Sequence, residues 1–325
     1  MRITPKWGRS GNTRLPVYLL TLILFIATSH VAADSPDILI VASSDAAIYQ
    51  KFQDAYRKAY TDSGSAKDNA LQQTIYLEGK HIERNQVTHG TQLIITIGSR
   101  AARAIAALSL DIPVLNTVLP ESVFLSLAYE NETCSKSSAV YIDQPISRQG
   151  YLAELIFPFK KEYGLLLGPV SIRRQPEIDL FRQVTQRQLT VMAVDRDEST
   201  MAAGRKLLSR TDLFLAINDP VVLNRENAKW LLYVAYQKRL PVIGFSRAYV
   251  KAGAAAAVFS ELDQMAGQAA EITYQWRKSN SNCLPEPQYP HDFRVAINRA
   301  VIQSLGGIIE NEDKLAELIL EKEQH

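Results

Sequence analysis

Small hydroxyl residues and a glycine lie where several predicted strands end and a helix begins. Residues of this type leave backbone N–H groups free at the positive end of a helix dipole, and such groups suit a carboxylate or another anion. The alternative for any one of these serines is ordinary helix capping, but their number favours a binding site. The residues are Ser43 and Ser44, Gly98 and Ser99, Thr117, and Ser171.

A second group of candidates lies in the second half of the chain. Asn218 and Asp219 follow an apolar run, where an acid that faces a ligand can take the ammonium group of an amino compound. Helix capping is an equally good alternative for Asp219. Ser246 adds a hydroxyl after a later strand, and Arg100 and Arg247 can each clamp an anion through a planar guanidinium.

Motifs of catalysis and of cofactor binding are missing from the sequence. It has no Gly-x-Ser-x-Gly elbow, no phosphate loop of the Gly-x-x-x-x-Gly-Lys type and no Gly-x-Gly-x-x-Gly fingerprint. The five histidines are scattered, and no cluster of His, Cys and Asp has the spacing of a metal site. We therefore expect a binding protein that is not an enzyme and that uses no cofactor or metal.

Short apolar strands alternate with amphipathic helical segments along the chain. Continuous apolar strands between helices are typical of a parallel sheet that is covered on both faces. We predict an α/β protein with two doubly wound parallel-sheet lobes joined by hinge strands, and a ligand site beyond the carboxyl ends of the strands. The predicted strands are 37–43, 92–97, 112–117, 139–142, 163–167, 189–194, 212–217, 241–244, 255–259 and 292–297.

The first 33 residues have the layout of a secretory signal peptide. Four basic residues and no acid accompany an apolar run that is shorter than the roughly 20 residues needed to cross a membrane. We predict cleavage after Ala33 and a periplasmic location; an uncleaved membrane anchor is the alternative. Loss of residues 1–33 changes the formal net charge from +2 to −2, so we expect no binding of nucleic acid.

The remaining chain is long enough for two domains. We predict one lobe from residues 34–142 together with 260–325, and a second lobe from residues 143–259. Cys134 and Cys283 lie in polar stretches, and an oxidising compartment favours a disulfide between them. Two unpaired thiols are the alternative.

The sequence resembles the periplasmic substrate-binding proteins of ABC transporters, in the branch that includes tryptophan- and tyrosine-binding members, over roughly residues 36–306. The resemblance is strongest at TDLFLAINDP (211–220), LPVIGFS (240–246) and VAIN (295–298). It implies a type I periplasmic-binding-protein fold that closes on its ligand by hinge bending. It also implies that the ligand is contacted by Ser43, Ser44, Gly98, Ser99, Thr117, Ser171, Asn218, Asp219 and Ser246, whereas Arg100 departs from the family pattern.

These features predict a periplasmic solute-binding protein that captures a small polar solute between its lobes. An amino acid and an aromatic carboxylate both suit the loops. We expect a monomer whose macromolecular partner is an inner-membrane ABC permease. The alternative is a periplasmic sensor module that reports the ligand to a membrane signalling protein.

Overall fold

The computed structural model describes residues 37–64, 72–79, 81–87, 90–127, 136–185, 187–195, 200–279, 281 and 283–324. These residues form two β-sheets flanked by helices, which confirms the predicted α/β class. The predicted signal peptide and Cys134 lie outside the described residues. No helix in the described part of the chain is long and apolar enough to cross a membrane.

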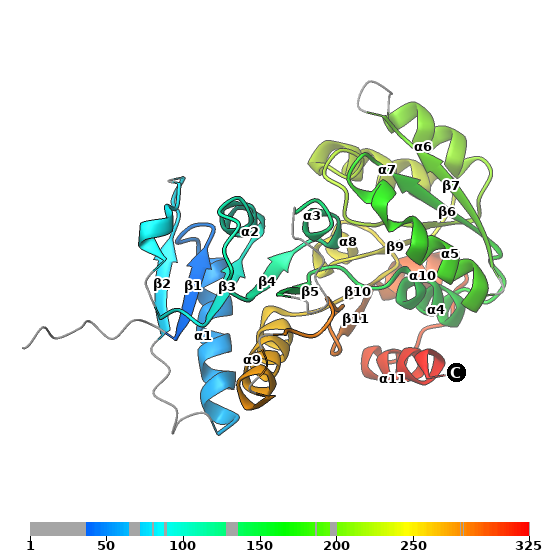
Figure 1. Cartoon of the computed structure of the whole chain (residues 1–325). Coiled ribbons are helices and arrows are strands. Elements are labelled where there is room, and N and C mark those ends of the chain that lie inside the picture. The colour runs from blue at the N-terminus through cyan, green and yellow to red at the C-terminus, as the bar shows by residue number, and fades with distance from the viewer. Residues whose placement is uncertain are drawn as a thin grey trace, which may run out of the picture. The chain divides into compact units, whose positions relative to one another are not determined.

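The first sheet has five parallel strands in the order β2-β1-β3-β4-β5 (Figure 1). Its central strands β1 and β3 are buried along their whole length, as their continuous apolar runs predict. The polar edge strand β2 is not among the predicted strands. The strands are β1 (Ile38–Ala42), β2 (Gln72–Tyr76), β3 (Leu93–Ile97), β4 (Val114–Leu119) and β5 (Ser137–Tyr141).

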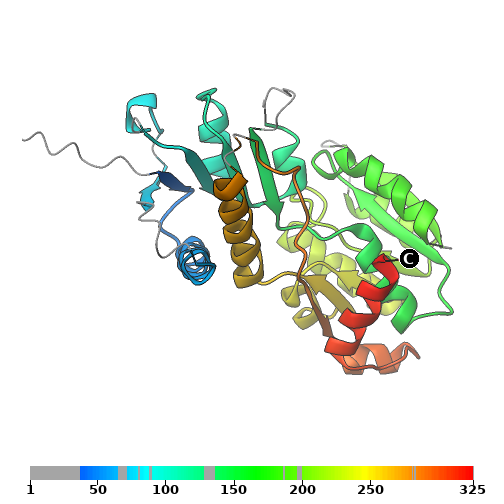
Figure 2. The same ribbon diagram turned by 60° about the horizontal axis from the view of Figure 1, so that its bottom comes forward.

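Helices cover both faces of this sheet (Figures 1 and 2). Because side chains alternate along a strand, Ile38 and Ile40 pack with α1 and α9, whereas Leu39 and Val41 pack with α2. The short α3 follows β4. These elements are α1 (Ala47–Asp62), the turn η2 (Arg84–Gln86), α2 (Ser99–Ala106), α3 (Glu121–Phe124) and α9 (Leu262–Ser279).

The second sheet repeats the same strand order and adds one antiparallel strand. Its order is β7-β6-β8-β9-β10-β11, and β11 pairs antiparallel with β10. The strands are β6 (Glu162–Leu167), β7 (Gln188–Ala193), β8 (Leu213–Leu215), β9 (Val242–Gly244), β10 (Ala256–Phe259) and β11 (Arg294–Ile297).

The helices of the second sheet also lie on both of its faces. Apolar residues of α4, α5, α10 and α11 share one core with β6, whereas those of α6 and α7 pack on the other face. The elements are α4 (Ile146–Ile156), the turn η3 (Ser171–Arg174), α5 (Gln175–Val184), α6 (Thr200–Leu208), α7 (Arg225–Gln237), α8 (Arg247–Lys251), α10 (Arg299–Ser304) and α11 (Glu312–Glu323).

The end of the chain divides between the two sheets, which differs from the predicted lobe boundary. The predicted first lobe includes residues 260–325, and α9 does pack on the first sheet. However, β11 extends the second sheet, and Phe293 and Leu315 belong to the core of that sheet. Backbone pairing of β11 with β10 therefore draws the last helices to the second lobe.

Within the described residues the chain passes between the sheets three times, and hydrogen bonds tie the three crossing segments together. Gln144 Nε2 donates to Ser260 Oγ (2.8 Å), and Ser260 Oγ donates to the carbonyl oxygen of Asp292 (2.6 Å). Arg148 donates to Gln144 Oε1 (2.9 Å) and to the carbonyl oxygen of Pro290 (2.7 Å). We call these residues the crossing network.

Candidate functional site

Both sheets reverse their strand order at one point, and ligands of such sheets bind beyond the carboxyl ends of the strands at that point. In the first sheet the reversal lies between β1 and β3, and in the second it lies between β6 and β8. Seven of the predicted site residues lie within four residues of the ends of these four strands: Ser43, Ser44, Gly98 and Ser99 in the first sheet, and Ser171, Asn218 and Asp219 in the second. Thr117 and Ser246 belong to the neighbouring strand ends.

Ser43 joins the two strand ends of the first sheet. Its side chain is buried, and its hydroxyl donates to the carbonyl oxygen of Ile97 (3.0 Å) and accepts from the N–H of Ala101 (3.0 Å). Both bonds are internal, so the hydroxyl fixes the loop before α2. Ser43 thereby holds the backbone of this loop in place.

Gly98 allows the loop after β3 to pass close to Ser43. Its φ is +92°, and a Cβ at this position would lie 2.6 Å from Ser43 Oγ and 2.9 Å from a ring carbon of Tyr49. Its N–H donates to the carbonyl oxygen of Thr117 (2.9 Å). A side chain at position 98 would therefore disturb the start of α2.

Ser44 and Ser99 are the half-buried hydroxyls of the first sheet's loops. Ser44 Oγ accepts from the N–H of Ala46 (3.3 Å), as a turn residue does. Ser99 is the first residue of α2, and its hydroxyl makes no hydrogen bond to another described residue. Ser99 therefore offers a free polar group at the positive end of a helix.

Thr117 has its hydroxyl inside the sheet. The residue is fully buried, and Oγ1 donates to the carbonyl oxygen of Thr96 (2.6 Å). A further buried polar link runs from Thr96 Oγ1 to Asn116 Oδ1 (2.8 Å), and from Asn116 Nδ2 to the carbonyl oxygen of Ser138 (3.0 Å). These bonds join β3, β4 and β5 below the candidate site.

Val118 is a strained residue at the same edge. Its φ is +54°, a conformation that β-branched residues rarely adopt, and the register of β4 against β5 shifts between Thr117 and Leu119. Strain of this kind persists where the surrounding structure holds it, and it is frequent at binding sites. No feature of the sequence predicts a positive φ at a valine.

Asp219 organises the loops of the second sheet. Its carboxylate is buried and accepts from three backbone N–H groups, those of Ser171 (2.8 Å), Val221 (2.9 Å) and Val222 (3.2 Å). Ser171 Oγ in turn accepts from the N–H of Gly168 (2.9 Å). The carboxylate caps the turn that follows β8 and ties it to the loop after β6.

Asn218 and Ser246 are half-buried neighbours of this framework, and their side chains make no hydrogen bond to another described residue. The buried amide of Gln149 holds both strand ends, because it donates to the carbonyl oxygens of Ala216 (2.8 Å) and Gly244 (3.0 Å). Asn218 and Ser246 thus present free polar groups from fixed positions. Arg247 is exposed and lies 3.4 Å from Glu261.

A buried charged cluster lies beside the loop after β4, and sequence analysis missed it. The guanidinium of Arg174 donates to Glu177 Oε2 (2.7 Å) and lies 3.3 Å from Glu121 Oε2. Glu121 also accepts from the Tyr289 hydroxyl (2.6 Å), and its N–H donates to Asp143 Oδ2 (2.7 Å). Arg174 and Glu177 are three residues apart, but Glu121, Asp143 and Tyr289 come from distant segments, so no local pattern brings the five residues together.

Three carboxyl groups share one guanidinium in this cluster. Burial raises the pKa of Asp143, and the positive charge of Arg174 only partly opposes this effect. Burial likewise raises the pKa of Glu177, against the same opposing charge. The cluster joins the loop after β4 to the start of α5 and to the last crossing segment. Protonation of its carboxyl groups would therefore change the contacts that hold these three segments together.

The predicted disulfide stays a prediction, because Cys134 lies outside the described residues. Cys283 is described, and it is not a free thiol.

Several solved structures have a similar fold. The ligand-free, open structure of CD0873, a substrate binding protein with adhesive properties from Clostridium difficile, has a TM-score of 0.65 at 15% identity; the match covers 84% of this chain and 96% of that chain. A complex of an ABC domain with L-Trp from Streptococcus pneumonia has a TM-score of 0.57 at 16% identity, with 88% and 98% covered. A conserved domain protein from Vibrio cholerae has a TM-score of 0.58 at 16% identity, with 89% and 98% covered.

No curated protein matches the sequence. Residues 42–318, which include every strand except most of β1 and all the predicted site residues, match the family described as ABC transporter substrate binding protein. This is a family of binding proteins rather than of enzymes, in agreement with the missing catalytic motifs. On this match and on its fold, the chain belongs to the family of ABC transporter substrate-binding proteins.

Proposed function

We propose that the chain is a periplasmic solute-binding protein that holds a small polar solute between the loops of its two sheets and delivers it to an inner-membrane ABC permease. The family match supports solute binding. We choose this site because the predicted residues lie where the strand order reverses in both sheets, which is where ligands of such sheets bind. The ligand, the permease and the periplasmic location are parts of the proposal.

The free polar groups indicate what kind of solute the loops would hold. In our proposal a carboxylate lies at the start of α2, where the Ser99 hydroxyl and the first backbone N–H groups of the helix donate to it. The amide oxygen of Asn218 and the hydroxyl of Ser246 accept from the other end of the solute. This arrangement suits an amino acid, and the L-Trp complex of the streptococcal structure supports that class.

In this proposal four of the predicted residues do not contact the solute through their side chains. They are Ser43, Thr117, Ser171 and Asp219. Their side chains are hydrogen-bonded within the protein, so we assign them to holding the loops in shape. The backbone of the same loops, including Gly98, lies next to the proposed solute. Binding would then depend on these residues through the loop geometry.

Closure in this proposal is a hinge motion about the crossing network. The three crossing segments are the covalent connections between the two sheets, and Gln144, Ser260 and Arg148 bond them to one another. Closure around a solute excludes water and strengthens the polar contacts.

A thermal-unfolding panel tests the proposal. Amino acids, aromatic acids, sugars and oxyanions are added separately, and a ligand at 100 times its Kd raises the stability by about 2.7 kcal/mol. We expect a shift with at least one amino or aromatic acid, which Asn218→Ala abolishes. Gln303→Ala, an exposed change on α10, is the matched control and keeps the shift.

Two other outcomes would change the proposal. No shift with any member of the panel would contradict capture of a small polar solute. A shift without solute uptake in membranes that contain the proposed ABC permease would favour the sensor alternative.

A further inference from the structure

The helices α6 and α7 of the second sheet carry a strongly basic surface (Figure 1). Residues 200–210 and 225–239, which include both helices and the turns that end them, contain seven Lys and Arg but only one acid, Glu226. The whole chain, in contrast, is nearly balanced, with 36 basic and 34 acidic residues. The seven cations are all exposed: Arg205, Lys206, Arg210, Arg225, Lys229, Lys238 and Arg239.

The exposed sides of the two helices form one continuous surface, which we call the α6–α7 face. The helices pack closely at Gly204 of α6, where a Cβ would lie 2.9 Å from the ring of Trp230 on α7. The guanidinium carbon of Arg205 lies 5.4 Å from the centre of the same ring. A cation of α6 therefore covers an aromatic side chain of α7, and no gap separates the charges of the two helices.

Tyrosines accompany the charges on the exposed side of α7. Residues that are three or four positions apart lie on the same side of a helix, and this spacing joins Arg225, Lys229, Tyr233 and Tyr236. Tyr233 is 60% exposed and Tyr236 is 73% exposed. Tyrosine is enriched where proteins meet the headgroup layer of a membrane, because its ring is apolar and its hydroxyl is polar.

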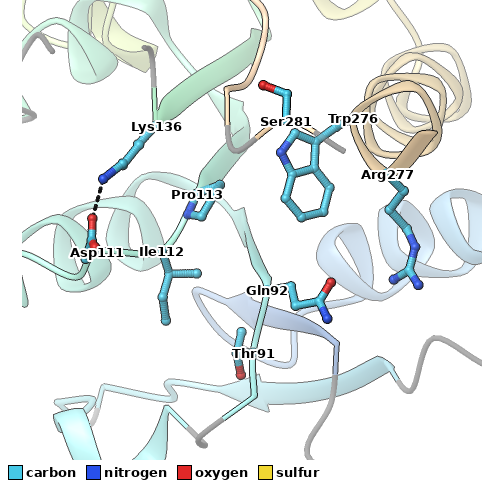
Figure 3. Close-up of a pocket in the computed structure, with 9 residues that line it drawn as sticks. All are labelled: Thr91, Gln92, Asp111, Ile112, Pro113, Lys136, Trp276, Arg277 and Ser281. Carbon is cyan, nitrogen blue, oxygen red and sulfur yellow. Dashed lines mark hydrogen bonds and ion pairs between the residues drawn. The ribbon is translucent and has the colours of Figure 1, made fainter. Parts of the chain in front are cut away.

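None of the seven cations is paired with a carboxylate in the part of the chain that the structure describes. Elsewhere such pairs are present; at a pocket of the first sheet, for example, Lys136 is paired with Asp111 (Figure 3). The acids nearest α6 in the sequence, Asp195, Asp197 and Glu198, precede its first residue, whereas its cations lie in its second half and after it. Unpaired like charges on one surface repel one another, so an external anionic surface that neutralises them is favoured.

We propose that the α6–α7 face docks on an anionic lipid surface. Its lysines and arginines reach the lipid phosphates, and Tyr233 and Tyr236 lie among the headgroups. A bilayer suits this face better than an acidic protein does, because exposed tyrosines beside flexible cations match a layer of mobile anionic headgroups. The proposal does not depend on the function proposed above, because the α6–α7 face contains none of the solute-loop residues.

Co-sedimentation with lipid vesicles tests the proposal. The protein is used in its predicted exported form, without residues 1–33, because their basic and apolar residues would bind a membrane by themselves; the described residues all belong to one compact unit that follows this segment. The formal net charge is then −2, so an anionic vesicle repels the chain as a whole and attracts only a concentrated basic face. We expect binding to vesicles that contain phosphatidylglycerol and none to vesicles of phosphatidylcholine alone.

Two double variants with the same charge change locate the contact. Lys206→Gln with Lys229→Gln removes one cation from each helix of the α6–α7 face and should weaken the partition coefficient at least about tenfold. Lys51→Gln with Lys58→Gln removes two exposed cations of α1 and is the matched control, which should bind like the wild type. Thermal unfolding at the wild-type temperature shows that both variants are folded.

Three results would overturn the proposal. Equal losses of binding in the two double variants would assign the attraction to overall charge rather than to the α6–α7 face. Equal binding to both kinds of vesicle would exclude recognition of anionic lipid. No binding to phosphatidylglycerol vesicles would refute lipid docking and would favour an acidic protein as the partner of this face.

Discussion

The substitution Gly98→Ala tests the loop geometry most severely. The new methyl group would lie 2.6 Å from Ser43 Oγ and 2.9 Å from the ring of Tyr49, and the backbone φ of +92° is one that alanine rarely adopts. The backbone strain costs about 1–3 kcal/mol. Displacement of the Ser43 hydroxyl removes two internal hydrogen bonds, each worth about 1 kcal/mol. We expect a loss of stability of about 3–5 kcal/mol.

Urea unfolding of the purified protein measures this loss, and Gly267→Ala is the matched control. Gly267 lies within α9, and a Cβ added there meets no atom within 4 Å. Alanine is the better helix former, so Gly267→Ala should raise the stability by about 0.5–1 kcal/mol. If Gly98→Ala unfolds at the same urea concentration as the wild type, our account of the loop between β3 and α2 is wrong.

Three further predictions concern the second sheet and the charged cluster. Asp219→Ala leaves three backbone N–H groups without their acceptor and should lower the stability by about 2–4 kcal/mol in urea unfolding. Ser246→Ala should change the stability by less than about 0.5 kcal/mol but weaken solute binding in calorimetry, because its hydroxyl has no internal bond. Burial raises the pKa of Asp143 and Glu177, so the folded chain binds these protons more tightly than the unfolded chain does. This tighter proton binding adds its full stabilisation of the fold below about pH 4. The stabilisation is lost as the pH rises through the pKa values of the two groups in the folded protein. Asp143→Asn should therefore lose less stability than the wild type over that rise.

Each of these predictions has a result that would count against it. Asp219→Ala with wild-type stability would mean that the carboxylate does not organise the two loops. Unchanged solute affinity in Ser246→Ala would remove this hydroxyl from the site. A stability difference between the wild type and Asp143→Asn that stays constant from pH 4 upward would contradict the raised pKa.

Strands with an apolar run could be predicted from the sequence, including the edge strands β5, β7 and β11, and the polar edge strand β2 could not. The apolar runs at β1, β3 and β6 have few other ways to be buried, so the pattern fixes their structure. The strand β2 reads QQTIY, which is as polar as a surface loop, and it is a strand because it pairs with β1. Likewise, only backbone pairing with β10 shows that β11 belongs to the second sheet.

The positions of the candidate site residues could be predicted, but their bonding could not. Any residue directly after a parallel strand lies at the carboxyl edge of the sheet, and this places Ser43, Asn218 and Asp219. Whether a hydroxyl or carboxylate there is free depends on neighbours from distant segments. Ser43 meets the N–H of Ala101, 58 residues away, whereas Asn218 meets no comparable partner among the described residues.

Hydrogen exchange of the backbone amides, with and without the solute that the thermal panel identifies, tests the central claim most directly. The account predicts that the solute slows exchange in the loops after β1 and β3 of the first sheet and after β8 and β9 of the second. Protection in the loops of one sheet only, or protection confined to the last turn of α9, would contradict capture between the two sheets.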